Sequence, residues 1–240
     1  MNIRDSIAFV TGANRGLGLF FARELLARGA TKVYAGARNI DGMDVGQPGI
    51  VPVQVDVTKP DSVAAAAARC ADVRLLVNNA GIARVMESTL DPDWIATSRE
   101  IMETNFYGMV LTTQAFAPVL AANGGGAIVN VLSDTAWFSR PMLAAYSASK
   151  SAAWSFTNAT RIDLRAQGIH VLGMHVGFLD TDMTKGYELR KTRPQDAVSA
   201  VLDGLESGKD EILVDANTQL IKQSLSSVDN AYYLNLPALA

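Results

Sequence analysis

The feature that most constrains the fold is an apolar run followed at once by a glycine-rich turn and a helical pattern. Residues 6–10 read SIAFV, residues 11–18 read TGANRGLG, and apolar residues then recur at helical spacing up to Arg28 and Gly29. A strand, such a turn and a helix open a dinucleotide-binding βαβ unit, because glycine lets backbone N–H groups approach a pyrophosphate at the helix N-terminus. The spacing Gly-x3-Gly-x-Gly differs from the usual Gly-x-Gly-x2-Gly, so a tight turn without a ligand stays an alternative.

The rest of the chain repeats this alternation. Strand-like runs cover 32–37, 50–55, 74–77, 127–132, 169–176 and 211–214, and helical patterns cover 58–68, 91–120, 149–165 and 194–205. We therefore predict an α/β fold: a single-domain Rossmann-type, doubly wound parallel sheet of about seven strands with helices on both faces, over residues 1–240. The helix over 91–120 is expected to break or bend near Asn105. The tail over 216–240 is expected to form a helix and then an arm that could serve as an interface.

Bulk properties exclude several classes of protein. The 240 residues are 49% hydrophobic, which is enough for a large core, and the net charge of −3 without a basic block disfavours nucleic acid as a partner. Cys70 is the only cysteine, so a reducing compartment is expected. Neither a signal peptide nor an apolar run long enough for a membrane is recognisable, and we predict a cytoplasmic protein. The two histidines, His170 and His175, have no metal-binding pattern around them and are interpreted as structural, with no metal site.

The residue after the second predicted strand bears on the cofactor. Arg38 lies twenty positions past Gly18, where NAD-binding proteins place an acidic residue on the ribose 2′-hydroxyl, and an arginine there suits a 2′-phosphate instead. Arg15, inside the glycine turn, could reach the same phosphate. Two solvated arginines are the alternative interpretation. We favour NADP (NADPH) as the cofactor.

Two polar segments fall where a ligand would be bound. The fourth predicted strand ends in Asn78-Asn79-Ala80-Gly81, and small polar residues at the carboxyl end of a parallel strand commonly line a ligand site. Asn105 lies among apolar residues, and a buried amide needs hydrogen-bond partners. It is therefore either a structural link or part of the site.

A serine, a tyrosine and a lysine form the candidate catalytic group. Ser133 follows the fifth predicted strand, and Tyr146 and Lys150 are four residues apart, which places both on one face of a helix. An ammonium near a phenol lowers the pKa of that phenol, so Tyr146 could exchange a proton near neutral pH, while Ser133 bonds the same reacting oxygen. A surface helix that happens to carry a tyrosine and a lysine is the alternative.

Together these motifs resemble the short-chain dehydrogenase/reductase family, in its compact single-domain branch. The shared features, spread over nearly the whole chain, are Thr11-Gly12-x3-Gly16-x-Gly18, Asn78 to Gly81, Asn105, and Ser133 with Tyr146-x3-Lys150. The resemblance implies that Tyr146 gives a proton to a carbonyl oxygen and that Lys150 holds ribose hydroxyls and lowers the Tyr146 pKa. It further implies that Ser133 orients the carbonyl and that Asn105 holds a water linking Lys150 to solvent.

The resemblance also implies the surroundings of the reaction. The expected cofactor contacts are Gly12, Asn14, Arg15, Gly16, Leu17, Gly18, Arg38, Asp56, Val57, Asn79, Ala80, Gly81, Tyr146, Lys150, Gly177, Leu179 and Thr181. Val176-Gly177 replaces the Pro-Gly pair of the family, and only about a dozen residues separate Thr181 from the helix at Pro194, a short substrate lid. The side chains expected to wall the substrate pocket, unless they belong to the core or an interface, are Trp137, Phe138, Met142, Phe178 and Tyr187.

The leading hypothesis is an NADPH-dependent oxidoreductase that interconverts a small-molecule carbonyl compound and an alcohol, as a homodimer or homotetramer. A non-catalytic NADP-binding sensor or interaction protein on the same fold is the alternative from another class. An NAD-linked dehydrogenase is a third, and Arg15 and Arg38 oppose it.

Overall fold

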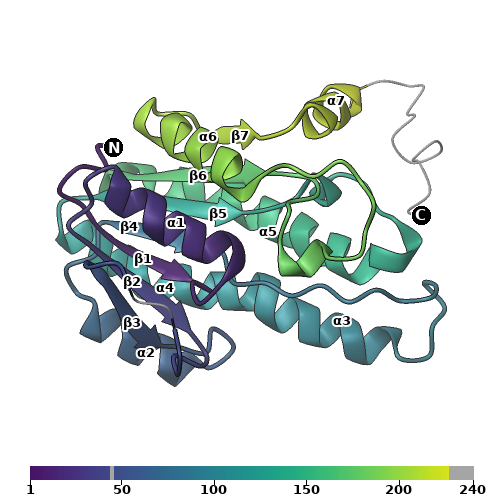
Figure 1. Ribbon diagram of the computed structural model, residues 1–240, viewed down its shortest axis with the longest axis horizontal. Coiled ribbons are helices and arrows are strands. Elements are labelled where there is room, and N and C mark those ends of the chain that lie inside the picture. Colours follow the sequence, from purple (N-terminus) through teal and green to yellow (C-terminus); the bar gives the residue numbers. More distant parts are fainter. Residues whose placement is uncertain (44–45, 227–240) are drawn as a thin grey trace.

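Seven parallel strands form one sheet in the part of the chain that the computed structural model describes, residues 1–43 and 46–226 (Figure 1). Their order across the sheet is β3-β2-β1-β4-β5-β6-β7. The predicted doubly wound Rossmann-type sheet is confirmed. The strands are β1 (Ile7–Thr11), β2 (Lys32–Ala37), β3 (Ile50–Gln54), β4 (Leu75–Asn78), β5 (Gly126–Val131), β6 (Ile169–His175) and β7 (Glu211–Leu213).

Helices cover both faces of this sheet. Helices α1 and α6 pack on one face, and α2, α4 and α5 lie on the other (Figure 1). None of the helices within the described ranges combines the length and apolarity that crossing a membrane requires. The helices are α1 (Gly16–Ala27), α2 (Pro60–Arg69), α3 (Trp94–Met102), α4 (Gly108–Ala122), α5 (Ala144–Asp163), α6 (Pro194–Glu206) and α7 (Ala216–Ser224).

The two cores follow from the alternation of side chains along each strand. Phe9 and Leu76 are partners in register between β1 and β4, and both face α2 and α4, where Phe9 meets Phe116 at 4.6 Å between ring centroids. Their neighbours Val10 and Val77 face α1 and α6. Because both faces are covered, the strands read as nearly continuous apolar runs, as is typical of parallel sheets.

The long helical segment before β5 is interrupted where the sequence predicted a bend. Between α3 and α4 the backbone forms one π-helical turn, Glu103–Tyr107, with Asn105 buried at its centre. Such turns occur within α-helices where the extra residue re-aims a side chain, often at a functional site. The π turn therefore presents Asn105 to the segment that follows β4.

The predicted start of one helix changes, and another predicted helix is found where it was expected. Helix α5 begins at Ala144, rather than at 149, so Tyr146 and Lys150 lie on the same helix. The helix expected after Asp215 is present as α7, and Asp215 caps it by accepting a 2.9 Å hydrogen bond from the Thr218 N–H. The arm expected after this helix falls on residues 227–240, outside the described residues.

Candidate active site

The carboxyl ends of β1, β4, β5 and β6 meet at one edge of the sheet, which is where the strand order reverses between β1 and β4. Ligands of open α/β sheets bind at such a reversal, because the two adjoining loops turn away in opposite directions. A cleft of about 600 Å³ lies there and runs from the glycine turn before α1 to Tyr146 on α5.

Close packing explains the glycine turn. Gly12 has a φ of +66°, and a Cβ on it would lie 3.0 Å from the Cα of Ala80. The turn is tied to the end of β4, because the Thr11 hydroxyl accepts hydrogen bonds from the N–H groups of Asn79 and Ala80 at 2.9 and 3.0 Å. The Asn79 amide donates in turn to the carbonyl oxygen of Thr11 at 2.9 Å. Two predicted cofactor-binding segments are thereby brought together.

The first turn of α1 is free of side-chain caps. Arg15 is the N-cap residue and makes no capping hydrogen bond, and no acidic side chain lies in the first helical turn. Gly16 and Leu17 line the cleft. Uncapped N–H groups and the positive end of the helix dipole fit a bound phosphate.

The two candidate arginines lie at the rim of this cleft. Arg38 is exposed and follows β2, and Asn14 and Arg15 line the same end. Arg15 forms an ion pair with Asp182, 3.3 Å from Nη1 to Oδ2, with side chains that are 72% and 69% exposed. Arg15 therefore bridges the glycine turn to the loop after β6.

Asp56 and Val57 form the wall of the cleft beyond Arg38. Asp56 Oδ1 accepts hydrogen bonds from the N–H and the hydroxyl of Thr58 at 3.0 and 2.8 Å. Burial opposes ionisation of Asp56, but these bonds and the charges of Arg38 and Lys59 offset it and lower its pKa. Asp56 is therefore a fixed, ionised acceptor beside an apolar side chain.

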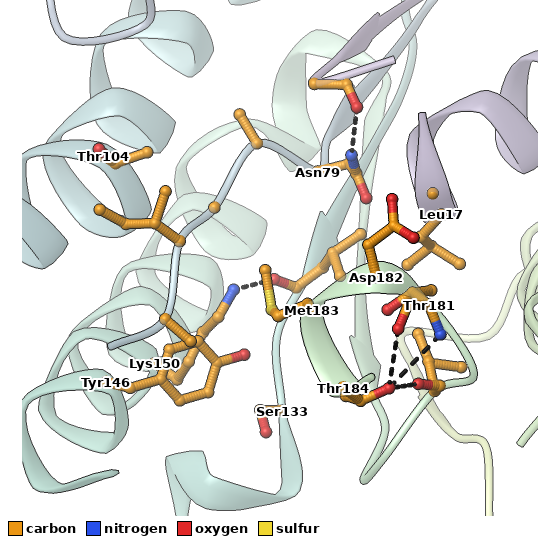
Figure 2. A pocket seen from close by; sticks show the side chains of 18 of the residues that line it. Leu17, Asn79, Thr104, Ser133, Tyr146, Lys150, Thr181, Asp182, Met183 and Thr184 are labelled. Carbon is orange, nitrogen blue, oxygen red and sulfur yellow. Dashed lines mark hydrogen bonds between the residues drawn. The ribbon is translucent and has the colours of Figure 1, made fainter. Parts of the chain in front are cut away.

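Ser133, Tyr146 and Lys150 converge at the other end of the cleft, opposite the turn that carries Thr181 and Asp182 (Figure 2). The Lys150 ammonium donates a 2.8 Å hydrogen bond to the carbonyl oxygen of Val131. It lies 5.6 Å from the centroid of the Tyr146 ring. Burial lowers the Lys150 pKa to about 8.

The expected effect of Lys150 on Tyr146 is not found in the structure. Desolvation raises the pKa of the half-buried Tyr146 phenol, the Asp134 carboxyl raises it further, and the Ser133 hydroxyl acts in the opposite direction. The prediction of a lowered pKa is therefore wrong for the protein alone. The physical reason is that burial disfavours the phenolate and a carboxyl lies near it, while the Lys150 ammonium donates to the Val131 carbonyl. Tyr146 holds its proton firmly.

Asn105 connects two elements of the site. Its side-chain oxygen accepts from the Ile82 N–H at 2.8 Å, and its amide donates to the Ile82 carbonyl at 2.9 Å and to the Ser149 hydroxyl at 3.1 Å. Ser149 donates onward to the Tyr146 carbonyl at 2.7 Å. Asn105 thus ties the segment after β4 to the helix that carries Tyr146 and Lys150, and its expected contact with a water stays a prediction.

The loop after β6 is held without the proline of the family pattern. The Val176 carbonyl accepts from the Asp134 N–H at 3.2 Å, and the Gly177 N–H donates to Asp215 at 2.8 Å. Further along, the Thr184 hydroxyl bonds the carbonyl oxygen of Leu179. Gly177, Leu179 and Thr181 all line the cleft, and their contact with a cofactor stays a prediction.

Two of the five side chains predicted for the substrate wall line the cleft, and their contact with a substrate stays a prediction. Phe178 and Tyr187 line the cleft, with ring centroids 6.0 Å apart. Among the described residues the lining of the cleft does not include Trp137, Phe138 or Met142.

Each of these three residues has another neighbour. Trp137 stacks on His175 at 4.0 Å between ring centroids. The ammonium of Lys222, a residue of α7, lies 4.5 Å from the centroid of the Trp137 ring. Phe138 is buried against Arg140, and the carbonyl of Met142 accepts from the Met86 N–H at 3.0 Å. The 3₁₀ turn over Asp134–Ala136 carries Trp137 away from the cleft and toward β6.

Sequence reasoning missed several residues that line the cleft: Thr104, Asp134, Thr135, Asp182 and Met183. Thr104 had a usable signal, since it precedes Asn105. Asp134 and Thr135 directly follow Ser133, and a turn predicted after Ser133 would have indicated that both lie beside the cleft. Nothing in the spacing of Asp182 and Met183 indicates that their loop folds back over the site.

The sheet, the glycine turn and the Ser-Tyr-Lys group in one cleft define a Rossmann-type fold with a candidate active site at the carboxyl ends of its strands. A family model described as short chain dehydrogenase matches residues 6–192. The chain belongs to the short-chain dehydrogenase family.

Known proteins extend this likeness. A crystal structure of a short chain dehydrogenase from Burkholderia cenocepacia J2315, in complex with NADP, superposes with a TM-score of 0.90 at 41% identity, over 96% of this chain and 97% of that one. Galactitol 2-dehydrogenase (L-tagatose-forming) of Cereibacter sphaeroides is 36% identical over 186 residues, which cover 74% of this chain and 72% of that protein. The 11-beta-hydroxysteroid dehydrogenase 1A of Arabidopsis thaliana is 31% identical over 200 residues, 77% of this chain. The match spans only about half of that relative, 55% of its length.

Proposed function

We propose that this protein is an NADPH-dependent oxidoreductase that interconverts a carbonyl compound and an alcohol, with Tyr146 as the acid and base. The observation that carries the proposal is one cleft that holds both an uncapped helix N-terminus beside Arg15 and Arg38 and the group Ser133, Tyr146 and Lys150. When bound, the cofactor supplies a hydride for the carbonyl carbon. The chain itself must then provide a proton for the carbonyl oxygen.

Tyr146 suits the role of proton donor. Its raised pKa keeps the phenol protonated at neutral pH, so the proton is present when a carbonyl oxygen gains charge. Lys150, buried one helical turn away, is proposed to hold the ribose and to bring its positive charge to the reacting oxygen. Ser133 is proposed to orient the carbonyl, and Asn105 to hold the helix in place.

The preference for NADPH rests on charge. Arg15 and Arg38 place two guanidinium groups at the end of the cleft where a 2′-phosphate would lie, and guanidinium binds phosphate through paired N–H donors. The solved relative from Burkholderia cenocepacia was crystallised with NADP. The proposal includes one catalytic domain over 1–240 and a homodimer or homotetramer in the cytoplasm, which stay predictions.

The decisive experiment measures NADPH oxidation, with NADH in parallel, against a panel of small, aromatic and bulky aldehydes, ketones and quinones. Tyr146→Phe is expected to lose at least about a hundredfold in kcat. Tyr107→Phe, at an exposed tyrosine of the π turn, is the matched control and should leave turnover unchanged. Tight NADPH binding with no Tyr146-dependent turnover on any carbonyl would favour the non-catalytic sensor.

A further inference from the structure

The hydroxyl of Ser133 makes three hydrogen bonds to the two residues that follow it in the chain. It donates to Asp134 Oδ1 at 2.9 Å, and it accepts from the N–H and the hydroxyl of Thr135 at 3.2 and 3.0 Å. A hydroxyl has one proton and two lone pairs. The one proton that a carbonyl oxygen in the cleft could receive from Ser133 is therefore bound to Asp134.

Asp134 occupies a buried position at the edge of the cleft. It is 5% exposed, lies in the 3₁₀ turn after Ser133, and lines the cleft itself. Its second oxygen faces the loop after β6, since a Cβ on Gly177 would lie 3.3 Å from Oδ2. An ionised carboxylate can only accept hydrogen bonds, whereas a protonated carboxyl also donates one.

The charged and titratable groups around Asp134 come from every neighbouring element. Asp215 approaches from the N-terminus of α7, Arg140 from the segment before α5, and Tyr146 from α5. Lys150 and His175 contact the chain just before Asp134: Lys150 donates to the Val131 carbonyl, and His175 Nδ1 lies 3.0 Å from the Ser133 carbonyl.

We propose that Asp134 is a positioning residue that decides whether Ser133 can donate a hydrogen bond to the substrate oxygen. In its ionised form Asp134 holds the Ser133 proton, so the serine cannot orient a carbonyl. In its protonated form Asp134 donates to Ser133 through the same 2.9 Å contact, the Thr135 hydroxyl rotates away, and the Ser133 proton turns into the cleft. This inference rests on the proposed carbonyl reduction, and it adds to that reaction a further step that depends on pH.

The switch falls inside the physiological range. Burial raises the pKa of Asp134 to about 6, the bond from Ser133 opposes this shift, and the nearby Asp215 carboxyl adds to it. Lys150 titrates near pH 8 and Tyr146 holds its proton to higher pH. The three steps are thus separated along the pH axis, and the lowest belongs to Asp134.

The first test is the pH profile of kcat/KM for carbonyl reduction between pH 5 and 8, with the spontaneous decay of NADPH subtracted. In the unaltered protein kcat/KM is expected to fall about tenfold as pH rises through 6, the size of one lost hydrogen bond. Asp134→Asn should remove this step, because its amide can donate to Ser133 at every pH. An Asp134→Asn protein with lower activity but the same step near pH 6 would overturn the proposal in favour of a merely structural role.

Ser133→Ala provides the coupling test. If Asp134 acts through Ser133, then adding Asp134→Asn to Ser133→Ala should leave kcat/KM between pH 5 and 8 unchanged, because the group that Asp134 controls is gone and the direct effect of Asp134 on the Tyr146 pKa lies at higher pH. Independent effects of the two substitutions, multiplying in the double variant, would contradict action through Ser133.

A second measurement needs no turnover, and it separates this inference from the proposed function. A carboxyl with a raised pKa contributes stability below its ordinary pKa near 4, and that contribution is lost as pH rises through about 6. As pH rises from 4 to 7, the melting temperature of the unaltered protein should therefore fall relative to that of the Asp134→Asn variant. In Ser133→Ala the midpoint of that fall should move to higher pH, since the donor that favours the ionised carboxylate is absent.

An unchanged midpoint in Ser133→Ala would overturn the link between Ser133 and Asp134. A shifted midpoint in a protein that reduces no carbonyl would keep the link and reject the proposed function. The two failures are thereby distinguishable.

Discussion

The ammonium of Lys150 donates a 2.8 Å hydrogen bond to the carbonyl oxygen of Val131 at the end of β5. Lys150 is 4% exposed, and its burial lowers its pKa to about 8. A buried cation without a carboxylate partner costs folding stability, because protein replaces its hydration poorly. Such a group is retained where binding or catalysis needs its charge.

Lys150→Met should consequently raise stability while it removes activity. Methionine fills a similar volume without a charge, so the free energy of unfolding at pH 7 is expected to rise by about 1–2 kcal/mol and turnover to fall about a hundredfold. The lowered pKa means that the charged form of Lys150 destabilises the folded protein below about pH 8 and that this cost is relieved as the lysine loses its proton. The difference in unfolding free energy between Lys150→Met and the unaltered protein should therefore shrink as pH rises from 7 to 9. Denaturant unfolding across this range measures it.

Exposed Lys209 supplies the control for this substitution. Lys209→Met is expected to change neither unfolding nor turnover, since that side chain is solvated. If Lys150→Met were less stable than the unaltered protein at pH 7, the Lys150 ammonium would stabilise the fold, contrary to this prediction.

Asn105→Ala should destabilise the protein as well as affect turnover. The substitution removes one buried and two partly buried hydrogen bonds and leaves the Ile82 N–H and carbonyl without their partner, at a cost of about 3 kcal/mol. Thermal or denaturant unfolding measures this cost, with Glu103→Gln, an exposed residue of the same π turn, as the control. Loss of turnover at unchanged stability would mean that Asn105 acts only on the reaction.

The parts of the site that the sequence predicts are those governed by local geometry. Four-residue spacing on a helix places Tyr146 and Lys150 on one face, and strands that run in parallel bring the residues after β1 and β4 to one edge. Neither deduction needs the tertiary contacts of a side chain. Asn105 was also accessible, because a buried amide must find partners.

The parts that failed depend on contacts between residues far apart in the chain. Trp137 follows the site closely in sequence, but His175 on β6 and Lys222 on α7 draw it to the other side of the turn. The Tyr146 pKa is raised first by burial and then by Asp134, while the Lys150 ammonium donates to the Val131 carbonyl. Spacing gives a shared helix face, but it does not say which acceptor a side chain chooses.

Arg38→Asp tests the charge argument for the cofactor. Replacing a guanidinium with a carboxylate removes attraction for a 2′-phosphate and offers an acceptor to a 2′-hydroxyl. The ratio of kcat/KM with NADPH to that with NADH is expected to fall about a hundredfold. Arg165→Asp, at an exposed residue before β6, should leave the ratio unchanged, and an unchanged ratio in Arg38→Asp would refute the assignment.

Asp182→Asn should strengthen NADPH binding, an effect smaller than that of Arg38→Asp and opposite in direction. The ion pair with Arg15 joins two mostly exposed side chains, so its net energy is within about 1 kcal/mol. Removing it leaves Arg15 available to a phosphate, and the Kd for NADPH should fall about threefold while that for NADH stays the same. Titration of cofactor fluorescence measures both, with Asp180→Asn as the control. An equal gain for NADH would show that Asp182 limits access to the cleft and leaves Arg15 unaffected.

Glu211 links the buried His175 to α7, and it should carry an acid-dependent part of the stability. Its carboxylate lies 3.2 Å from His175 Nε2 and 3.1 Å from Lys222 Nζ. Burial opposes ionisation, but these two partners offset it and lower the Glu211 pKa to about 2. A lowered pKa adds stability above the ordinary value near 4.5, and that stability is lost as pH falls toward 2.

Glu211→Gln is therefore expected to lower the free energy of unfolding at pH 7 by about 2 kcal/mol, with the difference narrowing as pH falls from 4.5 to 3. Exposed Glu188→Gln, on the loop after β6, should leave the profile as it is. Since His175 also lies against the Ser133 carbonyl, the same variant should lower kcat more than it raises KM. A loss of stability that stayed constant from pH 7 to 3 would mean that Glu211 contributes through packing, not through its charge.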